Sequence, residues 1–374
     1  DVYKRQGIIF EEYRTEYVAD RTITFGKAFL GMTMECARCH DHKYDPISQK
    51  NFYEISSFFN STNEIGHAGY GPGQVAGPSL LLTNDEQETL IDYIKNDLNS
   101  QKEKITQNRS QNEQAFENWF TEKKAATQHI VKNINLGLVA HYPFDEFIPK
   151  TRAKTFYSPS RVRGQKAATL FEPIIDKEHN QKGFLIDEYT QMKLPEKIGW
   201  FDQTDPFTLS FSIYADHKDQ ESIVFGHCEQ IRLGLKGYSF FIIDNKLKFI
   251  MARSWPQNAI EIQTLQPISA KKWSQVTITY DGKGSVGGIQ IYINGKKTAV
   301  KRKGDELYKS ILFKPDIHTY GFEGFKIGSS HKLKAFYGGG FDDLKIFDKE
   351  LTGLEVAYQN DPNFFNQLSA GDLS

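Results

Sequence analysis

The sequence is poor in the features that define several common classes of protein. It has 3 cysteines in 374 residues, too few for a scaffold held together by disulfide bonds. Lysine plus arginine number 46 and aspartate plus glutamate 47, so no excess of positive charge favours nucleic acid or an anionic membrane as a partner. No apolar run approaches the length of a membrane span. What remains is a globular chain long enough for two domains.

Two of the three cysteines stand in one short motif, Cys36-Ala37-Arg38-Cys39-His40. The pattern C-x-x-C-H is the attachment signature of c-type haem, in which two thiols bond to the porphyrin and the histidine binds the iron. On one turn of helix, positions i and i+3 share a face, so Cys36 and Cys39 can reach one macrocycle. The motif therefore predicts a covalent haem c at Cys36 and Cys39, with His40 as the iron ligand.

Two other interpretations of the motif stay open. The thiols could form a small disulfide loop, or they could hold a non-haem metal such as zinc together with His40 and His42. Zinc sites usually recruit a second, distant pair of ligands, whereas the third cysteine, Cys228, lies far along the chain. Haem is therefore the leading interpretation.

A second iron ligand and partners for the haem propionates would come from outside these three residues. Met32 and Met34 lie just upstream, and His67 lies in a stretch rich in glycine and proline. The simpler interpretation is that the methionines fill the core and that His67 is a solvated loop residue. Arg38 and Lys43 carry the charge that suits propionates, or they are ordinary surface cations.

The first part of the chain has helical periodicity. Apolar residues recur every three to four positions over residues 7–59, interrupted by the motif, and Ser48 is expected to cap the last helix of this part. No glycine or proline stands between Asn84 and Asn135. We therefore expect a helical spacer, either one projecting helix or a helical hairpin, over residues 83–135.

From Gly137 onward the period changes to two. Short alternating or apolar runs are bounded by turn residues, such as Asp244-Asn245 and Asn294-Gly295. Many short strands with turns at this spacing predict an antiparallel β-sandwich or jelly roll. Trp273 opens one of the strands and is expected to face the core rather than to serve as a sugar platform.

Three aspartates are candidate calcium ligands in this β-rich part. Asp145 lies near the first strand, and Asp342 and Asp343 lie near the last, two strands that we expect to pair. Several converging carboxylates would suit Ca²⁺. The alternative is that Asp342 and Asp343 cap a turn and bond to backbone amides. No paired catalytic carboxylates and no Ser/His/Asp signature stand out, so enzymatic activity stays open.

The residues around the motif resemble a known family, the planctomycete-type cytochrome-c-like domain. The resemblance covers about residues 11–65 and the C-terminal part of that domain. It implies a large, exported, multidomain protein of uncharacterised activity, with a further domain beyond Ser374. The stretches that carry it are Tyr17-Val18-Ala19-Asp20-Arg21, Ala28-Phe29-Leu30-Gly31, C-A-R-C-H-D-H-K-Y-D-P-I over residues 36–47, and Phe52-Tyr53 through Phe58-Phe59.

The β-rich part resembles the laminin-G-like, concanavalin A-like jelly roll over residues 136–358. The resemblance implies a domain that binds carbohydrate or protein. One departure is a longer basic segment over residues 150–169, where family members often carry a short turn rich in glycine and asparagine. The matching stretches are residues 137–145, 207–214, 273–296 and 341–352.

The expected organisation treats the chain as an internal piece of a longer protein. Residues 1–6 match the translated mosaic-end sequence of a transposon used for sequencing libraries, so they are interpreted as a sequencing or cloning scar. A cytochrome-c-like helical fragment is expected over residues 7–82 and a spacer over 83–135. The sandwich follows over 136–358, and residues 359–374 would lead to a missing C-terminal domain.

These features predict an exported protein, periplasmic or extracellular, that combines haem-linked electron transfer with a sandwich that binds a glycan or a protein. It would need a redox partner, and neither nucleic acid nor a transmembrane segment is expected. The main rival is a binding or scaffolding protein whose C-x-x-C-H segment holds another metal or is structural. A third hypothesis is that the missing domain is the catalyst and these parts only position it.

Overall fold

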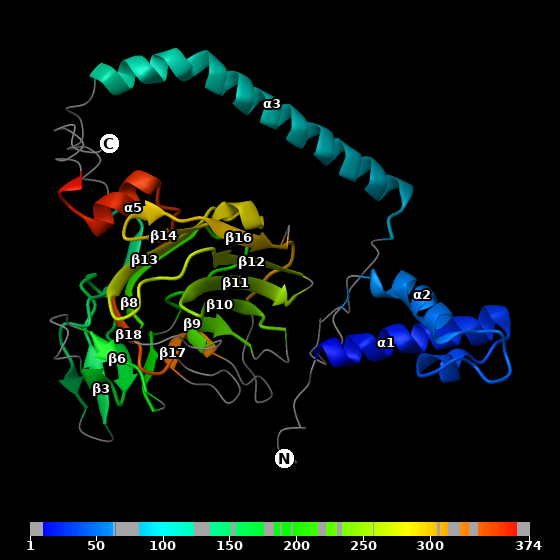
Figure 1. Cartoon of the computed structure of the whole chain (residues 1–374). Coiled ribbons are helices and arrows are strands. Elements are labelled where there is room, and N and C mark those ends of the chain that lie inside the picture. Colours follow the sequence, from blue (N-terminus) through cyan, green and yellow to red (C-terminus); the bar gives the residue numbers. More distant parts are fainter. Residues whose placement is uncertain are drawn as a thin grey trace. The chain divides into compact units, whose positions relative to one another are not determined.

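The computed structural model describes a helical segment, one long helix and a β-sandwich (Figure 1). Residues 1–6 and His67 lie outside the described part of the chain. No helix within that part is both long enough and apolar enough to cross a membrane. The described residues are 10–62, 64, 82–122, 135–150, 154–175, 183–187, 189–195, 197–215, 222–229, 234–256, 258–304, 307–312, 322–328 and 336–364.

The helical segment contains two α-helices joined by tighter turns. Ser48 caps the second helix as predicted, because its hydroxyl accepts a hydrogen bond from the amide of Asn51, while the Asn51 side chain accepts one from the amide of Ser48. This reciprocal capping box satisfies two backbone donors at the helix start. The elements are α1 (Phe10–Phe25), the π-helical turn η2 (Gly26–Leu30), the 3₁₀ turn η3 (Met34–Arg38) and α2 (Gln49–Asn60).

A small apolar cluster holds this segment together. Met34 of η3 packs where Gly26 leaves room, because a Cβ atom at Gly26 would overlap the Met34 side chain. Inside the segment, the hydroxyls of Thr22 and Ser56 are hydrogen-bonded at 3.1 Å and connect α1 to α2. The buried members of the cluster are Ala19, Met34, Ala37, Ile47 and Phe52.

A single helix occupies most of the predicted spacer. α3 (Asp85–Glu122) has 38 residues and is therefore about 57 Å long. Acidic residues fill its first turn, where they interact favourably with the helix dipole. Within the described residues the spacer is one continuous helix, and its apolar side chains, such as Leu90, Leu98 and Ile105, are exposed.

The β-rich part is a sandwich of two antiparallel sheets, as predicted. In the described part of the chain the first sheet has eight strands in the order β15-β14-β13-β8-β18-β6-β5, with β1 also paired to β18. The pairing of β1 with β18 brings the first and last strands together as expected. The strands are β1 (Leu138–Tyr142), β5 (Ile174–Ile175), β6 (Phe184–Leu185), β8 (Phe207–Tyr214), β13 (Trp273–Tyr280), β14 (Ile289–Ile293), β15 (Lys296–Lys297) and β18 (Gly340–Phe347).

The second sheet has ten strands among the described residues, in the order β16-β12-β11-β10-β9-β17-β7-β4-β3-β2. Two of the predicted hairpin turns, one in each sheet, have the positive φ angles that two-residue hairpins require. These angles are 50° and 61° at Asp244 and Asn245 in the second sheet, and 50° and 75° at Asn294 and Gly295 in the first. The strands are β2 (Ile148–Pro149), β3 (Thr155–Ser158), β4 (Ala168–Phe171), β7 (Gln191–Lys193), β9 (Ser222–Cys228), β10 (Gly237–Ile243), β11 (Lys246–Ser254), β12 (Asn258–Thr264), β16 (Val300–Lys303) and β17 (Phe322–Gly328).

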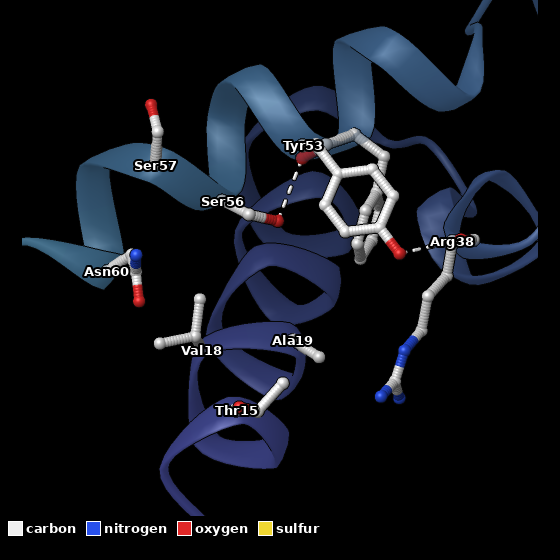
Figure 2. A pocket seen from close by; sticks show the side chains of 9 residues that line it. Thr15, Val18, Ala19, Arg38, Tyr53, Ser56, Ser57 and Asn60 are labelled. Atoms are coloured by element: carbon white, nitrogen blue, oxygen red, sulfur yellow. Dashed lines mark hydrogen bonds between the residues drawn. The ribbon is translucent and has the colours of Figure 1, made fainter. Parts of the chain in front are cut away.

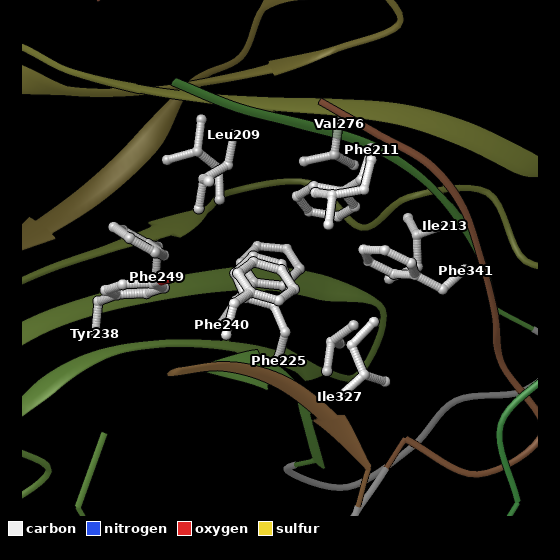
Figure 3. Packing of buried hydrophobic residues seen from close by; sticks show 14 of the residues in the cluster. Leu209, Phe211, Ile213, Phe225, Tyr238, Phe240, Phe249, Val276, Ile327 and Phe341 are labelled. Carbon is white, nitrogen blue, oxygen red and sulfur yellow. The ribbon is translucent and has the colours of Figure 1, made fainter. Parts of the chain in front are cut away.

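Aromatic rings fill the space between the sheets (Figure 3). The ring of Phe225 lies parallel to those of Phe240 and Phe325, with centroids 5.0 Å and 4.7 Å apart. From the other sheet, Phe211 meets Phe225 edge to face at 5.1 Å and stacks on Phe341 at 5.2 Å. Such pairs add about 0.5–1.5 kcal/mol each beyond the burial of their apolar area. The core therefore joins the two sheets through rings contributed by strands far apart in the sequence.

Two short helices accompany the sandwich, η6 (Val286–Gly288) and α5 (Gly353–Asn360). The segment before α5 is tied to the outer face of β8. The Thr208 hydroxyl donates to the carbonyl of Lys349 at 2.8 Å and accepts from the amide of Leu351 at 2.9 Å. Leu351 and Val356 then pack with Tyr292 in a small apolar cluster. This explains why Thr208 is buried although it faces away from the main core.

Candidate functional site

The C-x-x-C-H motif lies on η3 and the two residues after it. In a 3₁₀ helix, positions i and i+3 lie one above the other. Cys36 and Cys39 have this relationship, and the amide of Cys39 donates to the carbonyl of Cys36 at 3.3 Å. Both thiols are free and exposed. The two thiols therefore share one face, as the spacing predicts, and a reactant in solvent can reach them.

His40 follows this turn with its imidazole exposed. Its Nδ1 lies 2.7 Å from the carbonyl oxygen of Asp41. A carbonyl oxygen can only accept a hydrogen bond, so Nδ1 carries the proton and Nε2 of the neutral ring keeps its lone pair. Histidines that bind metals commonly donate their other N–H to a carbonyl in this way. The tautomer of His40 is thus the one in which Nε2 can act as a ligand.

His42 has a structural role in the turn between η3 and α2. Its side chain is only 7 % exposed. Its Nδ1 accepts hydrogen bonds from the amides of Tyr44 at 3.3 Å and Asp45 at 2.8 Å. Its own amide donates to the carbonyl of Ile47 at 2.8 Å. His42 therefore holds the turn that follows His40, a role for which the sequence pattern offered no signal.

The protein groups that haem c would use are present at the motif, and the described residues do not form a four-ligand zinc site. In the described part of the chain, no three histidine, cysteine, aspartate or glutamate side chains converge as a metal-binding group. Cys36, Cys39, His40 and His42 are all described, yet they do not assemble the four ligands of a structural zinc site. Two exposed thiols and one imidazole with a free Nε2 are the protein groups that haem c uses.

The other residues named near the motif have partners within the helical segment. Arg38 donates to both carboxylate oxygens of Glu16, at 3.0 Å and 2.6 Å, so its charge is already paired. Lys43 is exposed and lies over a neighbouring tyrosine ring. Met34 is 1 % exposed and belongs to the apolar cluster, and Met32 packs against it. The methionines therefore match the simpler interpretation, that of core packing.

A cavity of about 280 Å³ lies between α1 and α2 (Figure 2). At one end the hydroxyl of Tyr53 donates to the carbonyl of Arg38 at 3.1 Å. Arg38 lies between the two cysteines in the sequence, so it connects the motif to this cavity. The cavity is lined by Thr15, Val18, Ala19, Arg38, Phe52, Tyr53, Ser56, Ser57 and Asn60.

The predicted calcium ligands do not come together as a group. Asp145 accepts a hydrogen bond from the guanidinium of Arg161 at 2.7 Å. Asp342 is buried in β18, with 5 % of its surface exposed. The described residues contain no cluster of three or more metal-ligating side chains that includes them. The calcium site stays a prediction, which melting curves with Ca²⁺ and with a chelator would test.

Asp343 stands at an irregularity of β18 with a φ of 46°. Its carboxylate accepts hydrogen bonds from His141 Nε2 at 2.7 Å and from Lys345 Nζ at 2.9 Å. Burial by itself would raise the pKa of Asp343, but these two partners outweigh it and lower the pKa to about 2. The carboxylate of Asp343 is thus paired with side chains of β1 and β18 within the sheet.

Trp273 corrects one expectation. Val276, Ile278 and Tyr280 of β13 are buried in the core, so the alternate positions, including Trp273, face outward. Its indole packs beside Tyr214, with ring centroids 5.7 Å apart, and it lies close over Gly340. The prediction that Trp273 faces the core was wrong because strand β13 begins on the outward phase of its alternation.

A polar and aromatic patch occupies the outer face of strands β11, β12 and β16. Ile260 and Ile262 of β12 are buried in the core, so Glu261 and Gln263 point to the opposite face. Directly paired residues of neighbouring strands share a face, which extends this outer face to both neighbours. The outward residues form two rows, one of Lys248, Gln263 and Lys301 and one of Ile250, Glu261 and Lys303.

Trp255, in the hairpin between β11 and β12, contacts three side chains of this face. Its Nε1–H donates to Glu261 Oε2 at 3.1 Å. The ammonium of Lys248 lies 3.6 Å from Glu261 Oε1. The ammonium groups of Lys248 and Lys303 lie 5.8 Å and 5.7 Å from the centroid of the indole, within the range of cation–π attraction. We call this set the β16 patch: Lys248, Trp255, Glu261, Gln263, Lys301 and Lys303.

Two family models match separate parts of the chain. Residues 2–64 match a family described as a protein of unknown function (DUF1549). Residues 187–357 match the concanavalin A-like lectin/glucanases superfamily. Comparison with curated proteins gives no significant match.

The solved structures similar to this chain include binding domains of botulinum neurotoxins. The serotype C1 binding domain is 17 % identical, with a TM-score of 0.42, over 62 % of this chain and 53 % of that one. The receptor binding domain of serotype D is 17 % identical, with a TM-score of 0.39, over 62 % and 54 %. The binding domain of neurotoxin DC in complex with rat synaptotagmin II is 18 % identical, with a TM-score of 0.41, over 63 % and 52 %.

This chain spans about half the length of those structures. The match over residues 187–357 agrees with two antiparallel sheets closed over one aromatic core. The β-rich part of the chain is therefore similar to the concanavalin A-like lectin/glucanases superfamily, and the helical segment before it is similar to the DUF1549 family.

Proposed function

We propose that the sandwich binds a glycan without transforming it and that the helical segment carries a covalent haem c. In this proposal the chain brings a redox group to a surface that the sandwich recognises. Export to the periplasm or the cell exterior is part of the same proposal. The proposal of glycan binding and the proposal of haem rest on different observations and are tested separately.

The observation that supports haem is the state of His40. The hydrogen bond from its Nδ1 to the Asp41 carbonyl, at 2.7 Å, leaves Nε2 as the ligand atom. The turn organised by His42 holds the backbone after it. Cys36 and Cys39, both exposed, would hold the porphyrin. Haem bound there would supply one-electron transfer.

The haem proposal is tested on the full chain, exported to the periplasm of a host that has haem-maturation machinery. We expect a pyridine haemochrome spectrum and a colour that survives extraction with acidified acetone. A Cys36→Ser/Cys39→Ser variant should be colourless. Cys228→Ala is the matched control, because Cys228 is buried in the sandwich and should not affect haem attachment.

Colourless wild-type protein, from a host that matures a reference cytochrome in parallel, would contradict the haem proposal. The rival would then be favoured: a binding or scaffolding protein whose C-x-x-C-H turn is structural or holds another metal. Metal analysis of the same sample separates these two forms of the rival. Binding by the sandwich would be unaffected by this outcome.

The observation that supports binding by the sandwich is the position of Trp255 in the β16 patch. Its half-buried indole is held by the hydrogen bond to Glu261 at 3.1 Å. Fixed aromatic side chains with few rotamers contribute binding area at a low entropic cost. Glu261 is the one carboxylate of the patch, whereas glycoside hydrolysis ordinarily uses a pair. The patch therefore suits recognition rather than cleavage.

Binding is tested by titrating the full chain with a panel of soluble polysaccharides in a calorimeter. We expect at least one to bind, and the Trp255→Leu variant to bind it about fivefold or more weakly. Trp273→Leu is the matched control, since Trp273 lies on the outer face of the other sheet. Melting curves show that each variant is folded. Equal losses in both variants would contradict the assignment, and release of reducing sugar would contradict binding without cleavage.

A further inference from the structure

The cations of the β16 patch exceed its carboxylates. Lys248 is paired with Glu261 at 3.6 Å. Lys301 and Lys303 are exposed, and neither forms an ion pair with any residue in the described part of the chain. Among the described residues of the patch, three ammonium groups thus stand with one carboxylate, which leaves two positive charges. The patch should therefore attract an anionic ligand.

The two surplus charges, those of Lys301 and Lys303, lie along one strand. Lys301 and Lys303 are alternate residues of β16, so they share a face and their Cα atoms lie about 6.6 Å apart. Among the described strands, β16 lies at one end of its sheet. Lys248 lies two strands away in the row of Lys301, at about 9.6 Å. Open surface along a strand with spaced cations suits a linear ligand with repeated negative charges.

We propose that the β16 patch binds an acidic polysaccharide, with its carboxylate or sulfate groups on Lys301 and Lys303 and a sugar ring against Trp255. This inference rests on the proposed binding function and names its class of ligand. The Trp255 indole is half-buried, its N–H donates to Glu261, and the ammonium groups of Lys248 and Lys303 lie beside its ring. The exposed part of the ring can contact the C–H groups of a sugar. The amide of Gln263, between Lys248 and Lys301 in the same row, can hydrogen-bond to hydroxyl groups.

The composition of the patch favours a polysaccharide over a membrane. Protein surfaces that bind anionic lipid usually carry four to eight basic side chains close together. Here two exposed lysines act beside a fixed indole, and the whole chain has a formal net charge of −1. The electrostatic attraction of the patch to a broad anionic surface would be weak. A polysaccharide that also contacts Trp255 gains a second, uncharged contribution to its free energy of binding.

The other sheet supplies a matched control. Lys296 and Lys297 are exposed on β15, which likewise lies at one end of its sheet among the described strands. A Lys296→Gln/Lys297→Gln variant has the same net charge as a Lys301→Gln/Lys303→Gln variant. Both pairs are exposed, so both variants are expected to fold, and melting curves check this. Any difference in binding between the two variants then reports the location of the charge.

The experiment titrates the full chain with polygalacturonate, and with dextran as a neutral polymer, at two salt concentrations. We expect polygalacturonate alone to bind, and Lys301→Gln/Lys303→Gln to weaken it about tenfold and to reduce its dependence on salt. Lys296→Gln/Lys297→Gln should stay within about twofold. Trp255→Leu should also weaken binding, with an unchanged dependence on salt.

Several outcomes would overturn the inference. Equal weakening by the two lysine variants would indicate an attraction that is not located at the patch. Tighter binding to phosphatidylserine vesicles than to polygalacturonate would indicate that the lysines of the patch bind a membrane. Tighter binding to polyglutamate would indicate that they bind an acidic peptide. Binding of a neutral glycan that the lysine changes leave intact would overturn the acidic ligand while keeping the proposed function. Binding to no polysaccharide at all would contradict both.

Discussion

Nδ1 of His227 accepts a hydrogen bond from the backbone amide of Gly324, at 2.7 Å, inside the sandwich. The imidazole is fully buried and lies against the indole of Trp200, with ring centroids 4.7 Å apart. An accepting Nδ1 means that the folded protein uses the neutral ring. Burial accordingly lowers the pKa of His227 to about 4.

This pKa predicts a loss of stability in mild acid. An unfolded histidine has a pKa of about 6.5. Between that value and the folded pKa of about 4, the unfolded chain binds a proton that the folded chain does not, so acid favours unfolding. The stabilisation is complete above pH 6.5. It falls by about 3 kcal/mol as the pH drops to the folded pKa.

The pH prediction is measured by urea unfolding of the wild type and of His227→Gln between pH 7 and pH 4.5. Glutamine keeps an oxygen that can accept from Gly324 but does not titrate. The variant should be less stable at pH 7, and the difference from the wild type should shrink toward pH 4.5. A difference that is constant with pH would contradict the assignment to His227.

A methyl group at Gly237 should strongly destabilise the sandwich. The φ angle of Gly237 is 122°, and a Cβ atom there would overlap the carbonyl oxygen of His227 and lie 2.8 Å from Cys228 Cα. We expect Gly237→Ala to lower the free energy of unfolding by about 3 kcal/mol or more. Gly287 is the control, because the nearest atom to its Cβ would lie 3.6 Å away. Urea unfolding that shows similar effects for both substitutions would contradict the prediction.

The three thiols should differ sharply in reactivity in protein made without haem. Cys36 and Cys39 are exposed, whereas Cys228 is buried and its pKa is raised by burial. A thiol reagent at pH 8 should therefore label two cysteines per native chain and three after denaturation. Cys228→Ala should lower only the denatured count. Labelling of Cys228 at the native rate of the other two would contradict the packing of β9.

Asp343→Asn should cost about 1 kcal/mol of stability at neutral pH, because it removes a charge paired with His141 and Lys345 and is one-third exposed. Asparagine tolerates the φ of 46°, so the effect reports the charge. Since the folded pKa lies near 2, below that of unfolded aspartate, this stabilisation is present above about pH 4 and is lost as the pH falls toward 2.

Asp244→Asn is the control for Asp343, as Asp244 is exposed in a hairpin turn with a φ of 50°. Its substitution should change the free energy of unfolding by less than about 0.5 kcal/mol. Urea unfolding at pH 7 compares the two variants. Equal effects would mean that the partners of Asp343 contribute nothing measurable.

Local features of the sequence determined most of the elements. The period-two runs predicted the sandwich, and the turn residues Asp244-Asn245 and Asn294-Gly295 predicted hairpins that the structure contains. Ser48 identified the start of α2, and the lack of glycine and proline predicted α3. These features depend only on residues that are neighbours in the sequence, so they can be found from the amino-acid sequence alone.

The shared face of Cys36 and Cys39 can also be predicted from the local sequence, because one helical turn relates the two thiols. The position of the proton on Nδ1 of His40 cannot be predicted in this way, since it depends on where the carbonyl of the next residue points. The role of His42 likewise required the folded turn. Whether haem is attached there stays a prediction.

Only the tertiary structure decided which distant side chains meet. His141 and Asp343 are 202 residues apart in the sequence and 2.7 Å apart in the sheet. The β16 patch exists because the register of β12 with its two neighbours aligns charged residues from three strands around Trp255. That register, and the outward phase of Trp273, depend on which alternate side chains the aromatic core buries. Strand pairing is a non-local consequence of packing that core, and no short sequence pattern encodes it.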